Sequence, residues 1–159
     1  MLSTLRVVVI QPFWKHHAFI LRPLYLIYKR SDCDIRQELL DIARWFGTLP
    51  FKRIYVIAGN HDTPLDIREY PEHSDTRDAF LHALPDHATL LENGGDSYRG
   101  IFVWGSPYLI SREEVYRKRY YSNAFERRAA EREGLWQELP DNLDVLMVCM
   151  RDLWPLARC

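Results

Sequence analysis

Cysteine is scarce in this sequence, and the three that occur, Cys33, Cys149 and Cys159, form no Cys-x-x-Cys pair. An odd and widely spaced set of cysteines argues against a zinc ribbon and is unlike the disulfide framework of a small secreted domain. We therefore expect reduced thiols and a cytoplasmic location. The first residues also lack the basic flank, clean apolar core and small-residue cleavage site of a signal peptide.

Long apolar runs and an excess of one charge are also missing. The apolar stretch at residues 18–28 is short, and Arg22 and Pro23 interrupt it, so it does not predict a membrane span. Basic and acidic residues nearly balance, 21 against 22, and no global field draws the chain to nucleic acid or to an anionic membrane. We expect neither as a partner.

Apolar residues, by contrast, are present in sufficient number to build a core. Of the 159 residues, 47% are hydrophobic and 13% are aromatic, which argues against disorder. A chain of this length most simply folds as one unit, so the sequence predicts a single domain over residues 1–159.

One stretch of the sequence carries chemistry. Residues 54–58 form a run that is typical of a strand buried on both faces, and Gly59 follows directly. Ligands of open α/β sheets bind at the carboxyl ends of strands. Asn60 offers an amide oxygen to a hard cation, and His61 can donate a proton near neutral pH. The alternative is an ordinary turn in which Asn or Asp caps a helix.

The pattern around this stretch predicts an α/β fold. Apolar positions three or four residues apart indicate an amphipathic helix over residues 36–50, which would cross between parallel strands. Two further helices are expected, at residues 76–84, which Pro85 ends, and at the heavily charged residues 111–138. Other strands are expected at residues 5–10, 24–28, 88–91, 101–104 and 143–148.

The connections between these elements carry further predictions. Residues 88–91 and 101–104 are expected to pair as a hairpin across the turn-rich residues 93–96. Residues 63–75 are rich in polar and breaking residues and predict a loop, in which His73 would be exposed to solvent.

Other polar residues are explained by structural roles and need no functional site. His82 and His87 flank a helix end, where they suit the helix dipole and need no metal. The arginines between Arg112 and Arg132 alternate with glutamates, which predicts a solvated, ion-paired surface. Phosphate or base contacts from these helices are the less favoured alternative, since the glutamates would repel a nucleic-acid backbone.

The order Gly-Asn-His-Asp at residues 59–62 resembles the signature box of the calcineurin-like metallophosphoesterases. The likeness extends over about residues 31–147. Three further segments occur in the order of the family's brain-type branch: Trp-Phe-Gly-Thr-Leu-Pro at residues 45–50, Ile-Phe-Val-Trp-Gly-Ser-Pro at residues 101–107 and Asp-Val-Leu at residues 144–146.

The resemblance implies an α/β/β/α sandwich with a mixed sheet, of which this chain would form a part. It also implies a phosphodiesterase-type hydrolase that acts on a phosphoester with a pair of divalent metal ions, Mn, Fe, Zn or Mg. By this resemblance Asn60 would ligate a metal, and His61 would contact the phosphate and assist proton transfer. Tyr108 would lie in the substrate cleft.

Several ligand motifs of the family have no counterpart here. Gln-Pro-Phe at residues 11–13 replaces the family's Asp-x-His, Lys29 falls near the position of the bridging Asp, and Val148 replaces the start of Thr-His or Ser-His. The final Gly-x-His motif lies beyond the last residue. We therefore expect residues 11–30 and 148–159 to diverge, and a truncated domain whose uncovered sheet edge favours self-association.

Four residues near the missing motifs have simpler roles than metal ligation. Adjacent His16 and His17 point to opposite sides of an extended chain, so at most one could face a site. Asp32 and Asp34 precede a helix, and Asp34 with Gln37 resembles a capping box, so we assign both aspartates to capping.

Asn60 is thus the one clear metal ligand in the sequence. A neutral amide alone cannot hold a divalent cation against water, because affinity rises with the charge and number of ligands. The sequence therefore predicts a metallophosphoesterase-like domain with weakened or lost hydrolysis. A non-catalytic interaction module that retains the fold is the alternative, and a nucleic-acid binder is less favoured.

Overall fold

The computed structural model describes residues 2–12, 19–29, 35–111 and 124–149, the first two ranges by their backbone. His16, His17, Asp32 and Asp34 lie outside the described residues, as do Arg112, Arg117 and Arg119 of the charged segment. None of the helices in the described ranges is long and apolar enough to span a membrane.

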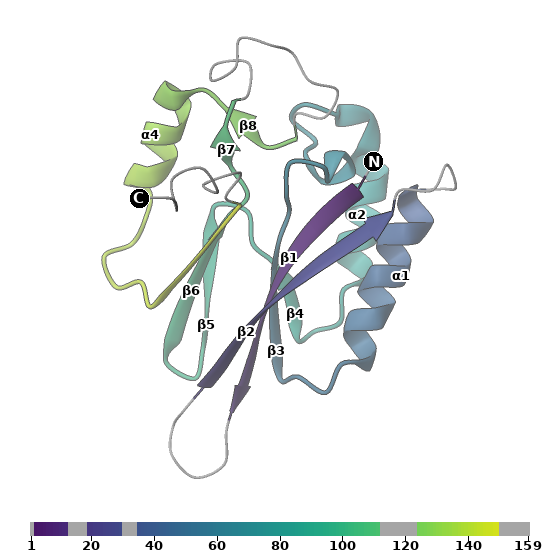
Figure 1. Ribbon diagram of the computed structural model, residues 1–159, viewed down its shortest axis with the longest axis vertical. Helices are drawn as coiled ribbons and strands as arrows, with labels where there is room; N and C mark the ends of the chain where they lie inside the picture. Colours follow the sequence, from purple (N-terminus) through teal and green to yellow (C-terminus); the bar gives the residue numbers. More distant parts are fainter. Residues whose placement is uncertain (1, 13–18, 30–34, 112–123, 150–159) are drawn as a thin grey trace, which may run out of the picture.

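Sheet A is mixed and has the strand order β2-β1-β3-β4 (Figure 1). β1 (Leu2–Pro12) pairs antiparallel with β2 (Phe19–Lys29) on one side and with β3 (Arg53–Ile57) on the other. β4 (Ala88–Leu90) runs parallel to β3. The strands predicted at residues 5–10 and 24–28 are confirmed. Both are longer than expected, because β1 and β2 pair with each other over their full lengths.

Two helices cross between strands of this sheet. α1 (Ile35–Thr48) leads from β2 to β3, which run in the same direction because both are antiparallel to β1, so the predicted crossover is confirmed. α2 (Ser74–Ala83) leads from β3 to β4 and packs against α1. The apolar face of α1 is buried through Leu39, Ile42, Ala43 and Phe46.

Sheet B consists of β5 (Gly94–Tyr98), β6 (Ile101–Ser106) and β9 (Val145–Val148) in that order. β5 and β6 are antiparallel, and β9 is parallel to β6. α1 and α2 lie on one side of sheet A and sheet B on the other, with α4 (Ala129–Gln137) beyond sheet B (Figure 1). The described chain is therefore a mixed α/β structure in layers.

The predicted hairpin between residues 88–91 and 101–104 is wrong. β4 belongs to sheet A, and the partner of β6 is β5, which covers residues predicted as a turn. The turn lies instead at Arg99 and Gly100, whose φ angles of 52° and 81° suit the type I′ turn of a two-residue hairpin. Gly95 is accepted in the strand because the ring of Phe102 occupies the space of a side chain: a Cβ there would lie 2.6 Å from Phe102 Cζ.

Two other connections differ from the prediction. Residues 63–75 contain the 3₁₀ turns η1 (Thr63–Leu65) and η2 (Pro71–His73), and residues 62–66 are buried instead of forming an exposed loop. His73 is half-buried beside the Tyr70 ring, with 6.4 Å between ring centroids.

Within the charged segment predicted as helix, the start of the described part is not helical. β8 (Glu126–Arg127) pairs in parallel with β7 (Leu109–Ile110), and α4 begins only at Ala129. Phe125 has a φ of 58°, which a helix does not allow. Arg127 is 3% exposed, so the surface predicted for this segment does not include it.

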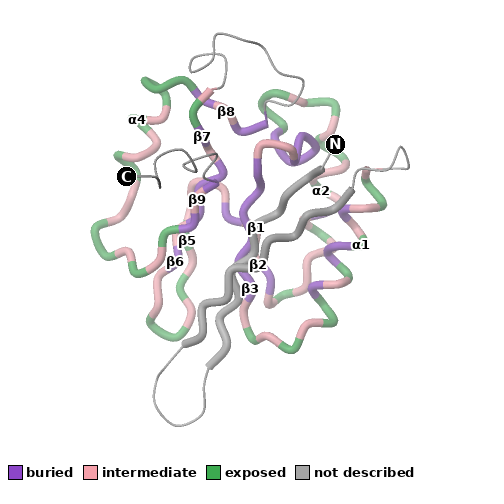
Figure 2. Tube along the Cα trace, viewed as in Figure 1, coloured by how far each residue is buried: buried purple, intermediate pink, exposed green. Residues whose placement is uncertain are grey.

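The core lies between the two sheets and beneath α1 and α2 (Figure 2). Gly105 of β6 sits where the sheets touch: a Cβ on it would lie 2.5 Å from Leu91 Cβ and 2.7 Å from Ile57 Cγ2. Such distances leave no room for a side chain, so glycine at this position allows β6 to approach sheet A.

A polar contact joins the two sheets at the other end of β3. The Asp96 carboxylate of β5 accepts hydrogen bonds from the Arg53 guanidinium and, at 3.1 Å, from Tyr55 Oη. Burial by itself raises the pKa of Asp96, but the hydrogen bonds from Arg53 and Tyr55 outweigh it and hold the pKa below its usual value. The charged form of Asp96 is therefore favoured by folding.

We expect Asp96→Asn to lower the free energy of unfolding by about 1–2 kcal/mol near neutral pH, because a charged acceptor is lost. Since folding lowers the pKa of Asp96, this contribution is present above the unfolded value of about 3.9 and is lost as the pH falls through the folded value. Urea denaturation of both chains across this pH range measures the difference, with the exposed Asp141→Asn as control. A difference that did not shrink in acid would contradict the assignment.

Candidate functional site

The carboxyl end of β3 passes into a closed turn. Ile54, Val56 and Ile57 are buried at 0–1% exposure, and the chain then turns at Gly59, which is also buried. The Gly59 N–H donates to Asp62 Oδ2 at 2.6 Å, and the Asp62 N–H donates to the Gly59 carbonyl at 3.1 Å. These reciprocal bonds fix the turn and leave no Gly59 N–H for a ligand.

Asn60 and His61 occupy the middle of this turn and are both partly exposed. The sequence placed them at the carboxyl end of a buried strand, and they lie there in the structure. Asp62, which follows them, is fully buried. Its carboxylate has a structural role, as in the alternative interpretation of this stretch as an ordinary turn. It closes the turn before η1, however, and does not cap a helix.

Behind this turn lies a buried ion pair that the sequence did not predict. Asp66 and Arg127 are 1% and 3% exposed, and Arg127 Nη2 lies 3.4 Å from Asp66 Oδ1. The second oxygen, Asp66 Oδ2, accepts the Phe125 N–H at 2.5 Å. The pair thereby fastens the segment after η1 to the turn before β8.

The ion pair continues into an aromatic and acidic network. The Arg127 guanidinium lies over the Tyr108 ring, 4.7 Å from its centroid, and Tyr108 Oη donates to Glu92 at 3.2 Å. Arg77 Nη2 of α2 donates to the other oxygen of Glu92 at 2.8 Å. Burial, followed by the negative charge of Glu92, raises the pKa of Tyr108. Tyr108 therefore has a structural place in this network, and a contact with substrate stays a prediction.

The donors around the turn do not fit a two-metal centre. The carboxylates of Asp62 and Asp66 accept hydrogen bonds inside the protein, at 2.6 Å and 2.5 Å. Within the described ranges, no group of three His, Cys, Asp or Glu side chains could hold a metal ion. Lys29, near the position of the family's bridging Asp, lies at the end of β2.

The other histidines of this region make contacts within the protein. His82 Nδ1 lies 2.8 Å from the Asp78 carbonyl oxygen, one helical turn earlier. His87 Nε2 lies 3.3 Å from the Phe46 carbonyl oxygen at the end of α1. His82 lies in the last turn of α2, where it was expected, whereas His87 contacts the end of α1 instead of α2.

Comparison with known proteins adds no relative: no family model matches this chain, and no curated protein matches it. The chemistry of the site must therefore be inferred from the residues themselves.

We expect Asp62→Ala to destabilise the protein by about 1–3 kcal/mol, because it leaves the buried Gly59 N–H without an acceptor. Asp62→Asn keeps an acceptor oxygen and should cost less. Urea denaturation of the two variants separates the loss of the acceptor from the loss of the charge. Equal losses in both variants would contradict the hydrogen-bond explanation.

Removing one partner of the buried ion pair should cost more than removing both. We expect Arg127→Met to destabilise the protein by about 3–5 kcal/mol, because Asp66 would remain buried without its counter-charge. The double change Asp66→Asn with Arg127→Met should recover part of this loss, since the introduced amide oxygen could still accept the Phe125 N–H. A double variant as unstable as the single one in urea would show that the charges are not coupled.

Proposed function

We propose that this chain is a phosphoester-binding domain of the calcineurin-like metallophosphoesterase type whose hydrolytic activity is lost or strongly weakened. The position of Asn60 and His61 carries the proposal. They follow a strand buried on both faces, and a turn closed by Asp62 holds them at the carboxyl end of sheet A. This edge is where open α/β sheets bind their ligands.

The layer order supports the finer fold assignment. Helices α1 and α2, sheet A, sheet B and helix α4 follow one another across the molecule, as expected for part of an α/β/β/α sandwich (Figure 1). The family-like segments at residues 45–50, 101–107 and 144–146 supply the end of α1, the strand β6 and the start of β9.

In this proposal the phosphoester meets side chains of the turn. His61 donates a hydrogen bond to a phosphate oxygen, and the imidazole is the group best able to transfer a proton near neutral pH. Asn60 offers an amide oxygen to one divalent cation. Because the nearest buried carboxylates are engaged by Gly59 and Arg127, the turn by itself supplies too little negative charge to hold two cations.

A non-catalytic interaction module is the second candidate, and the surface of sheet B favours it. β9 is an edge strand of the described sheet, and Leu146 within it is 42% exposed. An apolar edge strand without charged residues is a ready template for pairing with another chain. The self-association of this protein remains a prediction on the same ground.

Phosphate binding with matched histidine variants tests the first proposal. We expect calorimetry to show weak binding of phenyl phosphate, and His61→Ala to reduce the affinity about tenfold, which corresponds to loss of one charged hydrogen bond. His82→Ala removes an exposed histidine of α2 and should leave binding unchanged. Equal affinity in wild type and His61→Ala would refute the assignment of His61.

Hydrolysis is tested separately with manganese and bis(4-nitrophenyl) phosphate. We expect weak Mn²⁺ binding and little or no turnover. Tight Mn²⁺ binding with turnover that is lost in Asn60→Ala would contradict the loss of activity and would point to ligands outside the described residues, among them His16, His17, Asp32 and Asp34. A folded chain that bound neither phosphate nor metal would favour the interaction module.

A further inference from the structure

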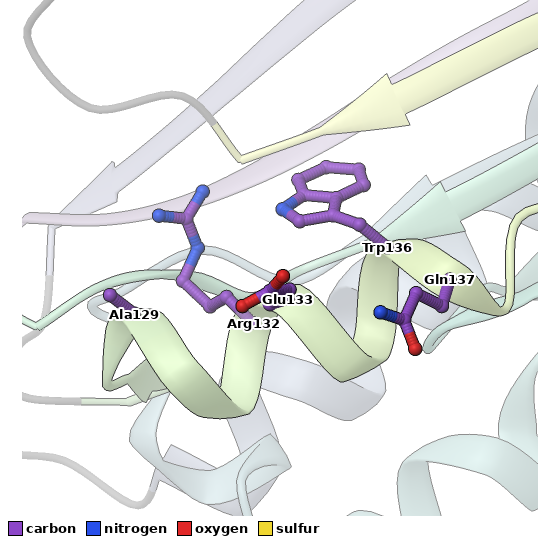
Figure 3. A pocket seen from close by; sticks show the side chains of 5 residues that line it. All are labelled: Ala129, Arg132, Glu133, Trp136 and Gln137. Atoms are coloured by element: carbon purple, nitrogen blue, oxygen red, sulfur yellow. The ribbon is translucent and has the colours of Figure 1, made fainter.

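A second feature of interest lies on α4, which does not include the turn that holds Asn60 and His61. A cavity of about 430 Å³, broadly open to solvent, lies along this helix, and its volume is within the range of about 300–1,000 Å³ that small-molecule sites occupy. The described side chains that line it come from one face of the helix: Ala129, Arg132, Glu133, Trp136 and Gln137. The side chains of Arg132 and Trp136 extend from the same side of α4 (Figure 3).

Arg132 is the most informative of these residues. Its guanidinium lies 5.9 Å from the centroid of the Trp136 ring, one helical turn on. Within the described part of the chain, Arg132 makes no ion pair, and its Nε, which is shielded from solvent, has no hydrogen-bond partner. A buried donor without an acceptor costs free energy that an added acceptor would recover.

Two other arginines, Arg127 and Arg68, differ from it in this respect. Arg127 is neutralised by Asp66, and Arg68 pairs with Glu131 of α4 at 2.6 Å. Glu131 is thereby directed to Arg68, and hydrogen bonding to Arg68 lowers the pKa of the Glu131 carboxyl.

The charges around the cavity indicate the class of ligand. A guanidinium binds a carboxylate side-on through Nε–H and one Nη–H, and the shielded Nε is one of these two donors. Glu133 also lines the cavity, so it disfavours a second negative charge, as on a phosphate dianion. The Trp136 ring offers an aromatic face on which a flat ring can stack.

We propose that Arg132 and Trp136 form a binding site for a small aromatic monocarboxylate. The carboxylate accepts hydrogen bonds from Arg132 Nε and one Nη, and the ring of the ligand packs on Trp136. Glu133 makes the site select one negative charge over two. This site is independent of the phosphoester proposal, because it shares no residue with the turn at Asn60 and His61.

Calorimetric titration of the full chain with 1-naphthoate tests the site. We expect binding that weakens at least tenfold in Arg132→Gln and is unchanged in Arg44→Gln, which removes an exposed arginine of α1. Quenching of indole fluorescence by 1-naphthoate should be largely lost in Trp136→Phe. Because Arg132 has no acidic partner among the described residues, Arg132→Gln should fold normally, which circular dichroism checks.

Comparison of ligands and sites completes the test. We expect 1-naphthyl phosphate to bind to this site more weakly than 1-naphthoate. In Glu133→Gln the difference between the two affinities should be smaller, because the negative charge of Glu133 is removed. His61→Ala should leave 1-naphthoate binding unchanged, so failure of either site is seen separately. Undiminished binding of 1-naphthoate to Arg132→Gln, no binding to the wild type, or tighter binding of the phosphate at this site would overturn the proposal.

Discussion

β1 and β4 pair with the two edges of β3, and helices and sheet B cover its two faces, so this short strand is buried from Ile54 to Ile57. Every backbone group that enters the strand must be bonded within the protein, and the chain can meet solvent only where the strand ends. After Arg53, the first residue that is partly exposed is Asn60, in the turn that begins at Gly59. The location of Asn60 and His61 is thus a consequence of burial as much as of their own chemistry.

A second layer of polar contacts holds the segment that follows. The Asp62 carboxylate satisfies the buried Gly59 N–H, and the Asp66 carboxylate satisfies Phe125 and Arg127. Both acids serve the backbone or an internal cation, so their negative charge is already compensated where they lie. The same contacts that order the turn therefore reduce its capacity to bind divalent cations.

The sequence was most informative where local patterns decide the structure. The run at residues 54–58 and the apolar face of α1 are buried as predicted, because a continuous apolar run marks the strand and helical periodicity marks the apolar side of α1. The partner of β6 could not be identified in the same way. Glycine at Gly94 and Gly95 indicates a turn by composition, whereas here the rings of Phe102 and Trp104 cover Gly95.

Local sequence patterns could not predict the buried ion pair of Asp66 and Arg127. Arg127 and the exposed Arg128 are adjacent and chemically identical, and only the distant Asp66 distinguishes them. In the candidate site, the positions of Asn60 and His61 were predictable from the strand that precedes them, whereas the engagement of Asp62 and Asp66 was not. Pairs so distant along the chain leave no periodic signal in one sequence.

The hydrogen bond from Phe125 N–H to Asp66 Oδ2 spans 59 positions of the chain. Neither the segment after η1 nor the turn before β8 can detach without breaking it and exposing a charge that was paired with Arg127. The two segments consequently open as one cooperative unit, and local fluctuations of the kind that let backbone amides exchange with solvent are suppressed in both together. The segment after η1 and the turn before β8, although far apart along the chain, therefore have the same free energy of opening.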